Sequence, residues 1–468
     1  MILRGPEHFI TLLVVPSFCE EQLIMTIETY DQALAFIHGR TKFKKIPTLK
    51  RMRRFLDELG SPDKRIKAIH IAGTNGKGST IAFLRNILQE DGLKVGSFTS
   101  PFLIRFNERI SVNGKPISDN DILRLTNIVY PVVAKLDDAL LEGGPTEFEI
   151  ITAMMFEYFS EGHADIVLVE VGLGGLLDST NVMTPELSVI TTIGWDHMHI
   201  LGDTLPKIAY QKAGIIKPKV PVVVGKIPEA PLKVIEHTAS GKKSPMTILG
   251  KQFTVNNLGM IDWEQHFSFK SDHDEFNDLS TGLIGDYQTD NAALAIQAYL
   301  NYCQLSSRPV NHNSVIAGIK QTKWGGRFER ISDHPTIVID GAHNISAVDE
   351  IVDLLESNFS KGKVYVLMGI LADKQADKMV EKMATVKNVS IILTSFNGPG
   401  KRNAADPQVL EEQVDSKENK KTVTDVIDDW QAAIDTIQKK LMTDDMLLIT
   451  GSLYFISDVR KYLLASLN

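Results

Sequence analysis

A glycine-rich loop lies between a short apolar run and a pattern typical of an amphipathic helix. The loop reads GTNGKGST (73–80), and its glycines let backbone N–H groups turn toward an anion at the positive end of the helix dipole. Lys77 would reach the β- and γ-phosphates of a nucleotide, while Ser79 and Thr80 supply hydroxyl groups. The strict phosphate-loop consensus fails because Gly78 separates Lys77 from Ser79. The alternative is a glycine turn with a solvated lysine, but the flanking strand and helix favour nucleotide binding.

Carboxylate, imidazole and hydroxyl side chains follow other strand-like runs. Glu170 lies near the end of DIVLVEVG, Asp196 and His197 follow LSVITTIG, and Ser100 follows VGSFT. Because ligands in open α/β sheets bind at the carboxyl ends of strands, Ser100, Glu170 and His197 could converge beside the loop and hold Mg²⁺. The alternatives are a buried ion pair for Glu170 and a core position for His197.

The elements that position these residues are runs rich in Val, Ile and Leu that alternate with amphipathic stretches. The runs span 68–73, 165–172, 187–194, 220–225, 336–341, 363–369, 389–395 and 446–452. Near-continuous apolar runs indicate parallel strands that are covered on both faces. We therefore predict an α/β fold, in which a P-loop-type ATPase domain with a mostly parallel sheet precedes a smaller Rossmann-like α/β domain. The polar stretch 253–282 predicts a small antiparallel insert. The aromatic and glycine-rich segment KWGGRFE (323–329) predicts a hinge near 324–327.

Composition excludes several classes of protein. Lys and Arg number 50 and Asp and Glu 58, which gives a net charge of −8 without any long basic stretch, so we expect no nucleic-acid partner. Cys19 and Cys303 cannot form a disulfide framework, so a cytoplasmic protein is expected. No apolar run reaches the roughly 18 residues of a membrane span, and no membrane partner is expected. The apolar segment 9–18 could be a signal peptide, but Pro16 interrupts it, and we interpret residues 1–24 as an N-terminal extension.

Many motifs, in order, resemble the folylpolyglutamate synthase branch of the Mur ligase family from about Met25 to the C-terminus. They are HIAGTNGKGST, TSPFLIRFNERISVNGKPIS, PTEFEIITAMMFEYF, EVGLGGLLDSTNV, DHMHILGDTLPKIAYQKAGIIKP, YQTDNAALA, WGGRFER, IDGAHN and TGSLYF. Each motif alone is weakly specific, whereas all of them in order are highly specific. The resemblance implies an ATP-binding domain over 25–325 and a glutamate ligase domain over 326–468.

The resemblance implies ATP-dependent amide ligation. ATP would phosphorylate the γ-carboxylate of a reduced folate, and the amine of L-glutamate would displace phosphate from the acyl phosphate. Dihydropteroate is the alternative acceptor, which would make the protein a dihydrofolate synthase alone or in addition. Expected partners are ATP, L-glutamate and the folate or dihydropteroate, expected cofactors are two Mg²⁺ ions, and a monomer is expected.

The resemblance also assigns roles to individual residues. Those implied in ATP binding are Thr74, Asn75, Gly76, Lys77, Gly78, Ser79, Thr80, Asn291, Arg327 and Asp340. Those implied in metal binding are Ser100, Glu170 and His197. Those implied in substrate binding are Thr146, Glu147, Phe148, Glu149, Leu177, Asp178 and Ser179. The stretch 41–48 resembles a pterin-binding loop, and the catalytic residues would be Lys77, Lys212 and His343, with His343 near the γ-phosphate or the acyl phosphate.

Lys212 matches a lysine that the family carbamylates. A carbamate turns a cation into an anionic oxygen ligand, which could hold a second Mg²⁺. Only the neutral amine reacts with CO₂, and roughly one lysine in a thousand is neutral near pH 7.4 at the reference pKa. Burial or a nearby cation must therefore lower the pKa of Lys212. The alternative is an ordinary salt bridge.

Four positions depart from the family pattern. Leu176 replaces an arginine, Gln211 a glutamate, and Phe102 and Tyr287 replace histidines. None removes an expected metal ligand or Lys212, so they bear on substrate contacts. Two other functions stay open: a Mur-type ligase acting on a cell-wall precursor, and a non-catalytic ATP-binding protein or ATPase. The PTEFE block disfavours the first, and the joint presence of the metal-type residues and Lys212 disfavours the second.

Overall fold

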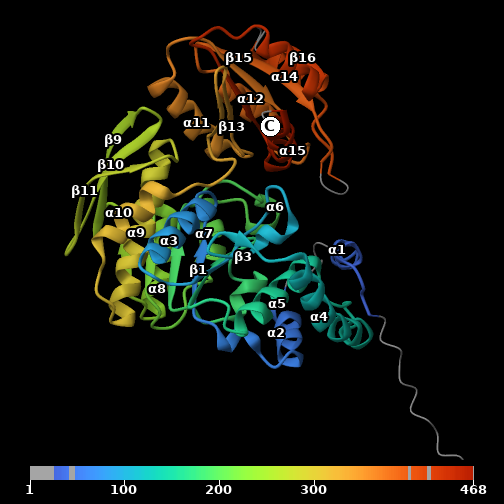
Figure 1. The fold of residues 1–468 in the computed structure, drawn as a ribbon, viewed down its shortest axis with the longest axis vertical. Helices are drawn as coiled ribbons and strands as arrows, with labels where there is room; N and C mark the ends of the chain where they lie inside the picture. Colours follow the sequence, from blue (N-terminus) through green and yellow to red (C-terminus); the bar gives the residue numbers. More distant parts are fainter. Residues whose placement is uncertain (1–25, 42–47, 399–401, 419–422, 467–468) are drawn as a thin grey trace, which may run out of the picture.

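The computed structural model describes residues 26–41, 48–398, 402–418 and 423–466, and the proposed extension 1–24 lies outside them. Two α/β domains lie one above the other in Figure 1, joined by the segment that follows α10. The N-terminal domain is built on an eight-stranded sheet of order β4-β3-β2-β5-β1-β6-β7-β8. Its strands are β1 (Ala68–Ala72), β2 (Val95–Phe98), β3 (Ile110–Val112), β4 (Lys115–Pro116), β5 (Ile166–Glu170), β6 (Leu187–Ile190), β7 (Val222–Val224) and β8 (Met246–Ile248).

Helices cover both faces of this sheet, which explains its continuous apolar strands. Ile69 and Ile71 of β1 pack in a core with α3 (Lys77–Glu90), α9 (Asp286–Ser306) and α10 (His312–Gln321). The opposite face carries the remaining helices of the domain. These are α1 (Tyr30–His38), α2 (Leu49–Glu58), α4 (Asp119–Ala139), α5 (Glu147–Ser160), α6 (Met198–Leu201), α7 (Leu205–Ala213) and α8 (Glu229–Gly241), with 3-10 turns η1 (Pro62–Arg65), η2 (Phe106–Arg109) and η3 (Ser179–Val182). Among the described residues, none of the helices has the length and apolar composition that a bilayer crossing needs.

The predicted antiparallel insert is a three-stranded sheet of β9 (Phe253–Ile261), β10 (Glu264–Ser271) and β11 (Glu275–Thr281). Its inner residues, such as Phe267 and Phe269, join the core formed by α3 and α9. The turn between β9 and β10 reaches the C-terminal domain, where the Trp263 ring lies 6.4 Å from the Phe328 ring. The sheet therefore flanks both domains, as Figure 1 shows.

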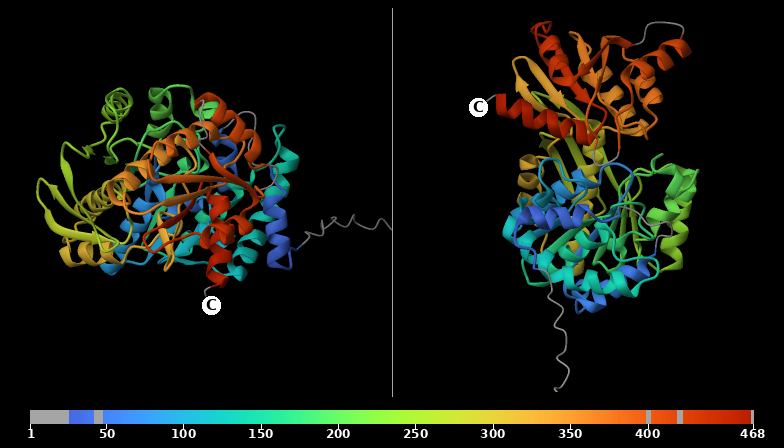
Figure 2. Two further views of the ribbon diagram at one scale, coloured as in Figure 1. Left: turned by 90° about the horizontal axis from the view of Figure 1, so that it is seen from above. Right: turned by 90° about the vertical axis from the view of Figure 1, so that its right-hand side faces the viewer.

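The C-terminal domain has a six-stranded sheet of order β12-β13-β17-β14-β15-β16, parallel except for β12. Its strands are β12 (Glu329–Asp333), β13 (Thr336–Ile339), β14 (Val364–Met368), β15 (Val389–Ser395), β16 (Val423–Asp429) and β17 (Met446–Thr450). One face packs on α11 (Ile345–Asn358), α12 (Ala376–Met383) and α13 (Pro407–Glu418), and the other on α14 (Trp430–Gln438) and α15 (Leu453–Ser466). Figure 2 shows the sheet between these layers.

The predicted fold class and antiparallel insert are confirmed. Each of the eight apolar runs contains a strand of one of the two large sheets. The predicted hinge coincides with the segment that joins α10 to β12.

Candidate active site

The phosphate loop connects β1 to α3 and is held by hydrogen bonds to two threonines that follow β6. The Thr192 hydroxyl accepts a hydrogen bond from the Asn75 N–H at 2.9 Å, and the Thr191 hydroxyl donates to the Asn75 carbonyl at 2.6 Å. Gly76 has φ +84°, and a Cβ there would lie 2.2 Å from the side-chain oxygen of Asn291. Position 76 therefore requires glycine, and Asn291 lies directly against the loop, as a nucleotide contact would.

Two lysines meet on one carbonyl of this loop. Lys77 Nζ donates to the Gly73 oxygen at 3.0 Å and to the Thr74 oxygen at 3.2 Å, and Lys212 Nζ donates to the same Gly73 oxygen at 2.9 Å. Lys212 is 4% exposed. Burial, and after it the charge of Lys77, lower the pKa of Lys212 to about 7. The positive charge at the base of the loop, where a polyphosphate would be held, is therefore mainly that of Lys77.

Glu170, at the end of β5, faces this positive charge. Its Oε1 lies 3.9 Å from Lys77 Nζ, and its Oε2 accepts the Ser100 backbone N–H at 3.0 Å. Burial raises the pKa of Glu170, while Lys77 opposes that shift. Ser100 and Glu170, predicted as metal ligands, are thus brought together.

His197, the third predicted ligand, has its Nε2 3.7 Å from the carboxylate of the neighbouring Asp196. It is the N-cap residue of α6, with a φ of +47°, and burial lowers its pKa. Its neighbour Asp196 forms an ion pair at 2.9 Å with Lys374 of the C-terminal domain. Burial acts to raise the pKa of Asp196, but Lys374, His197 and His343 outweigh it and bring the pKa to about 2. Within the described ranges no three His, Cys, Asp or Glu side chains form a metal-binding group; the predicted set combines one Glu and one His with a Ser.

The C-terminal domain contributes Asp340 and His343 from the loop after β13. The Asp340 carboxylate accepts the backbone N–H groups of Phe328 and Ala342, each at 2.7 Å, and burial raises its pKa. His343 Nδ1 lies 2.9 Å from the Gly341 carbonyl, and burial, with Lys374, lowers the pKa of His343 to about 4. The imidazole is therefore neutral at pH 7.

Amide side chains link the two domains at the phosphate loop. Asn75 Nδ2 lies 3.3 Å from Asn344 Oδ1, and Asn344 Nδ2 lies 3.0 Å from Asn75 Oδ1. The Thr74 hydroxyl is occupied within its own domain, since it accepts the Gly194 N–H at 2.9 Å. Ser79 and Thr80 are buried at the start of α3.

The predicted substrate residues on α5 are largely engaged by the protein. Thr146 is the N-cap of α5 in a capping box with Glu149, whose carboxylate also pairs with Arg51 at 2.9 Å in a buried site. Glu147 Oε1 lies 3.1 Å from His38 Nδ1. Gly172 leaves room for the Phe148 ring, because a Cβ there would come within 2.5 Å of it.

The second predicted substrate segment follows β5. Asp178 is buried, and it accepts the Leu173 N–H at 2.8 Å and the Thr180 N–H at 3.1 Å. Leu177 is 44% exposed, and Ser179 is half-buried at the start of η3. Residues 42–47 of the resembled pterin-binding loop lie outside the described residues.

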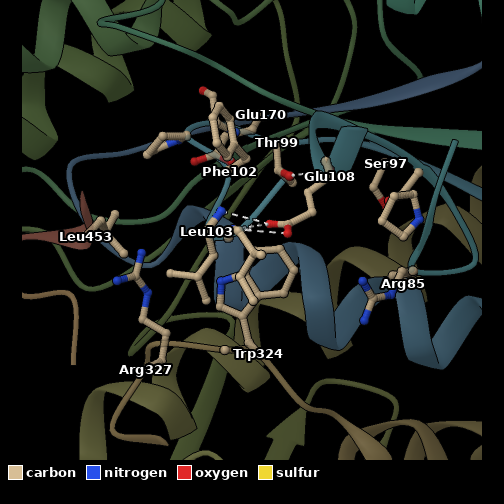
Figure 3. A pocket seen from close by; sticks show the side chains of 18 of the residues that line it. Arg85, Ser97, Thr99, Phe102, Leu103, Glu108, Glu170, Trp324, Arg327 and Leu453 are labelled. Atoms are coloured by element: carbon tan, nitrogen blue, oxygen red, sulfur yellow. Dashed lines mark hydrogen bonds between the residues drawn. The ribbon is translucent and has the colours of Figure 1, made fainter. Parts of the chain in front are cut away.

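A cavity of about 250 Å³ lies between the domains beside the phosphate loop (Figure 3). Its lining includes Gly78, Arg85, Ser100, Glu170 and Trp324. The indole of Trp324 lies against Gly78, where a Cβ would approach it to 2.9 Å. The cavity therefore adjoins the two predicted metal ligands that lie together.

The positions that depart from the family pattern are accommodated. The Leu176 N–H donates to the Gln211 carbonyl at 2.7 Å, a backbone contact that either side chain permits. The Arg109 guanidinium lies 5.2 Å from the Phe102 ring centroid. Burial and the charge of Asp340 raise the pKa of Tyr287.

Sequence reasoning missed three residues of this region. Asn344 stands inside the recognised block IDGAHN, so a signal for it was present, whereas nothing around Lys374 or Arg85 distinguishes them from surface cations. Lys374 and Arg85 reach this region because segments that are distant in the sequence lie close together in the fold.

Comparisons with known proteins agree with this geometry. Residues 71–299 match the family described as Mur ligase middle domain, and residues 326–453 match Mur ligase, glutamate ligase domain. A dihydrofolate synthase/folylpolyglutamate synthase of Bacillus subtilis (strain 168) is 42% identical over 93% of this chain and 99% of its own. A folylpolyglutamate synthase of Lacticaseibacillus casei is 35% identical over 93% of this chain and 99% of its own.

Solved structures are similar to this chain as well. The apo form of L. casei FPGS is 33% identical, with a TM-score of 0.81, over 93% of this chain and all of that chain. An FPGS-AMPPCP-folate complex has a TM-score of 0.82, with 33% identity and the same coverage. This chain therefore belongs to the folylpolyglutamate synthase/dihydrofolate synthase branch of the Mur ligase family.

Proposed function

We propose that the protein is an ATP-dependent ligase that adds L-glutamate to the γ-carboxylate of a reduced folate. The observation that carries the proposal is the phosphate loop itself, where the cationic Lys77 and the buried Lys212 donate to one loop carbonyl and the Glu170 carboxylate lies 3.9 Å from Lys77 Nζ. Phosphoryl transfer to a carboxylate brings negative groups together, and fixed cations lower the cost of that approach. The identity of the substrates is inferred from the names of the relatives.

The reaction has two chemical steps. The γ-phosphoryl group of ATP moves to an oxygen of the folate carboxylate, which gives an acyl phosphate and ADP. The glutamate amine then attacks the acyl carbon, loses a proton and expels phosphate, so that an amide forms. Lys77, the loop amides and Ser79 bind the triphosphate, while Asn291, Arg327 and Asp340 hold the nucleotide. The site supplies positioning and charge, and no protein nucleophile is required.

Ser100, Glu170 and His197 would hold Mg²⁺. The hydroxyl of Ser100 and the carboxylate of Glu170 are oxygen donors of the kind that this ion prefers. The Glu170 carboxylate accepts the Ser100 backbone N–H and lies 3.9 Å from Lys77 Nζ. When bound, the ion would neutralise phosphate charge.

Carbamylated Lys212 is the second part of the cofactor proposal. At a pKa of about 7, a large share of the amine is neutral near pH 7.4, against roughly one in a thousand for an exposed lysine. The side chain is also nearly inaccessible, which protects a carbamate once it has formed. The modified residue would support a second Mg²⁺ beside the acceptor carboxylate.

His343 would act as a neutral hydrogen-bonding partner near the acyl phosphate. If its Nδ1–H donates to the Gly341 carbonyl, Nε2 is left as an acceptor. We place the pterin between α5 and η3, where Glu147, Phe148 and Leu177 lie. Domain boundaries at 24/25 and 325/326, a monomeric state and a cytoplasmic location complete the proposal.

Release of ADP tests the function. We expect purified protein with ATP and Mg²⁺ to release ADP only when both a reduced folate and L-glutamate are present. An ATPase would release ADP with neither substrate, and that result would overturn the proposal. Replacing the folate by dihydropteroate in a parallel reaction tests the dihydrofolate synthase activity separately.

A further inference from the structure

The turn between β9 and β10 joins the core of the C-terminal domain, although the small sheet that carries it packs on the N-terminal domain. Phe267 and Phe269 of β10 lie in the core with α3 and α9. Met260 and Trp263, at the turn, pack instead against the core of the C-terminal domain. In Figure 1 the upper ends of β9 and β10 lie beside α11. The turn is therefore a point of contact between the two domains.

Trp263 makes this contact through its ring. The ring centroid lies 6.4 Å from that of Phe328 and 5.4 Å from that of Phe359. The guanidinium of Arg330 lies 4.4 Å from the same centroid. Aromatic rings at these separations attract each other, and so do an indole and a guanidinium within about 6 Å. All three partners belong to the C-terminal domain, so these contacts hold the domains together.

The backbone of this turn adopts a conformation that favours glycine. Ile261 of β9 pairs with Glu264 of β10, which leaves Asp262 and Trp263 as a two-residue turn. Their φ angles are +49° and +60°. Hairpin turns with positive φ at both positions prefer glycine at the second, because a Cβ is crowded there. The contacts of the Trp263 ring with the C-terminal domain offset this unfavourable backbone conformation.

Phe328, a partner of Trp263 in the segment that joins the domains, has a left-handed backbone as well. Its φ is +41°, and its side chain is 1% exposed. A bulky residue keeps such a conformation only where its surroundings enforce it. The rings of Trp263 and Phe359 contact the Phe328 ring, the latter at 5.5 Å. The Asp340 carboxylate accepts the Phe328 N–H at 2.7 Å. Loss of the Trp263 ring would therefore remove one of the contacts that enforce this conformation.

Phe328 connects the two residues of this domain that are proposed to hold the nucleotide. Arg327 precedes it in the chain, and Asp340 is its hydrogen-bond partner. The Arg327 guanidinium lies against Gly341, where a Cβ would come within 2.6 Å of it. A change of the backbone at Phe328 would therefore displace Arg327 and take one hydrogen bond from Asp340.

We propose that Trp263 is a positioning residue for ATP, which acts through Phe328 on the nucleotide-binding residues of the C-terminal domain. The β9–β10 turn thereby links the domain that carries the phosphate loop to side chains that hold the nucleotide from the other domain. The apparent affinity for a ligand is proportional to the fraction of protein in the binding-competent conformation, so this packing raises the affinity for ATP. The inference rests on the proposed nucleotide contacts of Arg327 and Asp340.

The test compares Trp263→Gly with wild type and with Trp430→Ala by isothermal titration calorimetry with ATP. Glycine suits the positive φ of position 263, so the turn is kept while the ring is removed. Trp430 is a half-buried indole whose ring neighbours, Phe455 and Tyr462, belong to its own domain, so it is a matched control. We expect the Kd for ATP to rise at least about fivefold in Trp263→Gly and to stay within about twofold in Trp430→Ala. The KM for L-glutamate should stay near the wild-type value in both.

Two further variants keep the test decisive if Trp263→Gly folds poorly. Trp263→Phe retains an aromatic ring and should keep a Kd for ATP close to that of wild type. Phe359→Leu removes the other ring that contacts Phe328 and should raise the Kd. An unchanged Kd in both Trp263→Gly and Phe359→Leu would overturn the inference, as would an equal rise in Trp263→Gly and Trp430→Ala. The Kd is measured without folate or L-glutamate, so it decides the inference even if no amide forms, a result that would refute only the proposed ligase function.

Discussion

Replacing Arg51 by methionine is expected to destabilise the N-terminal domain by about 3–5 kcal/mol, because it leaves a buried carboxylate without its counter-charge. Arg51 Nε lies 2.9 Å from Glu149 Oε2, and both side chains are 4% exposed. The same carboxylate accepts the Thr146 N–H at 2.8 Å at the start of α5. Loss of the pair should therefore loosen the helix that carries the proposed pterin residues.

Hydrogen exchange of the α5 amides in the full chain measures this effect locally, so the stability of the C-terminal domain does not enter the readout. Protection should fall roughly 100-fold or more, since each 1.4 kcal/mol is a factor of ten. The control is Arg124→Met, whose pair with Glu161 is 41% and 32% exposed and is worth less than about 1 kcal/mol. Adding Glu149→Gln to Arg51→Met should restore part of the loss, because no buried charge then remains. Equal losses in Arg51→Met and Arg124→Met would refute the reasoning.

Three other predictions concern catalysis, the domain contact and pH. Lys212→Ala should abolish ligation while far-UV circular dichroism stays unchanged; a fully active variant would end the proposed role. Lys374→Met removes the 2.9 Å pair with Asp196 across the domains and should increase the radius of gyration in small-angle scattering, whereas an unchanged radius would show that other contacts hold the domains. Burial, with Lys217, lowers the pKa of His70 to about 3, below its unfolded value near 6.5. Stability is therefore lost as pH falls from 6.5 toward 3, by up to about 1.4 kcal/mol per pH unit, and His70→Gln should have a shallower dependence; equal slopes would contradict this.

The sequence predicted the elements of the fold, and the glycine loop between a strand and a helix, because both depend on local patterns. Apolar runs mark strands that are buried on both faces, and the glycines of the loop mark a backbone that must approach an anion. The burial that Lys212 needs was inferred from chemistry, and the structure agrees, since the side chain is 4% exposed.

The features that the sequence did not predict depend on contacts between segments that are distant in the chain. Lys374 and Asp196 are 178 residues apart, and Arg85 is half-buried with Trp324 and the β3–β4 turn near its guanidinium. On sequence alone each is an ordinary surface charge. Thr74 and Glu149, for which motif matches implied ligand contacts, also accept backbone N–H groups, a structural role that their motifs did not indicate.

The most direct measurement of the central claim is the mass of the product. Purified protein would receive ATP, Mg²⁺, L-glutamate and a reduced folate, and the folate would be analysed by mass spectrometry. The account predicts a gain of one glutamate residue on the folate that requires ATP. A folate of unchanged mass, in a sample that binds ATP, would contradict it.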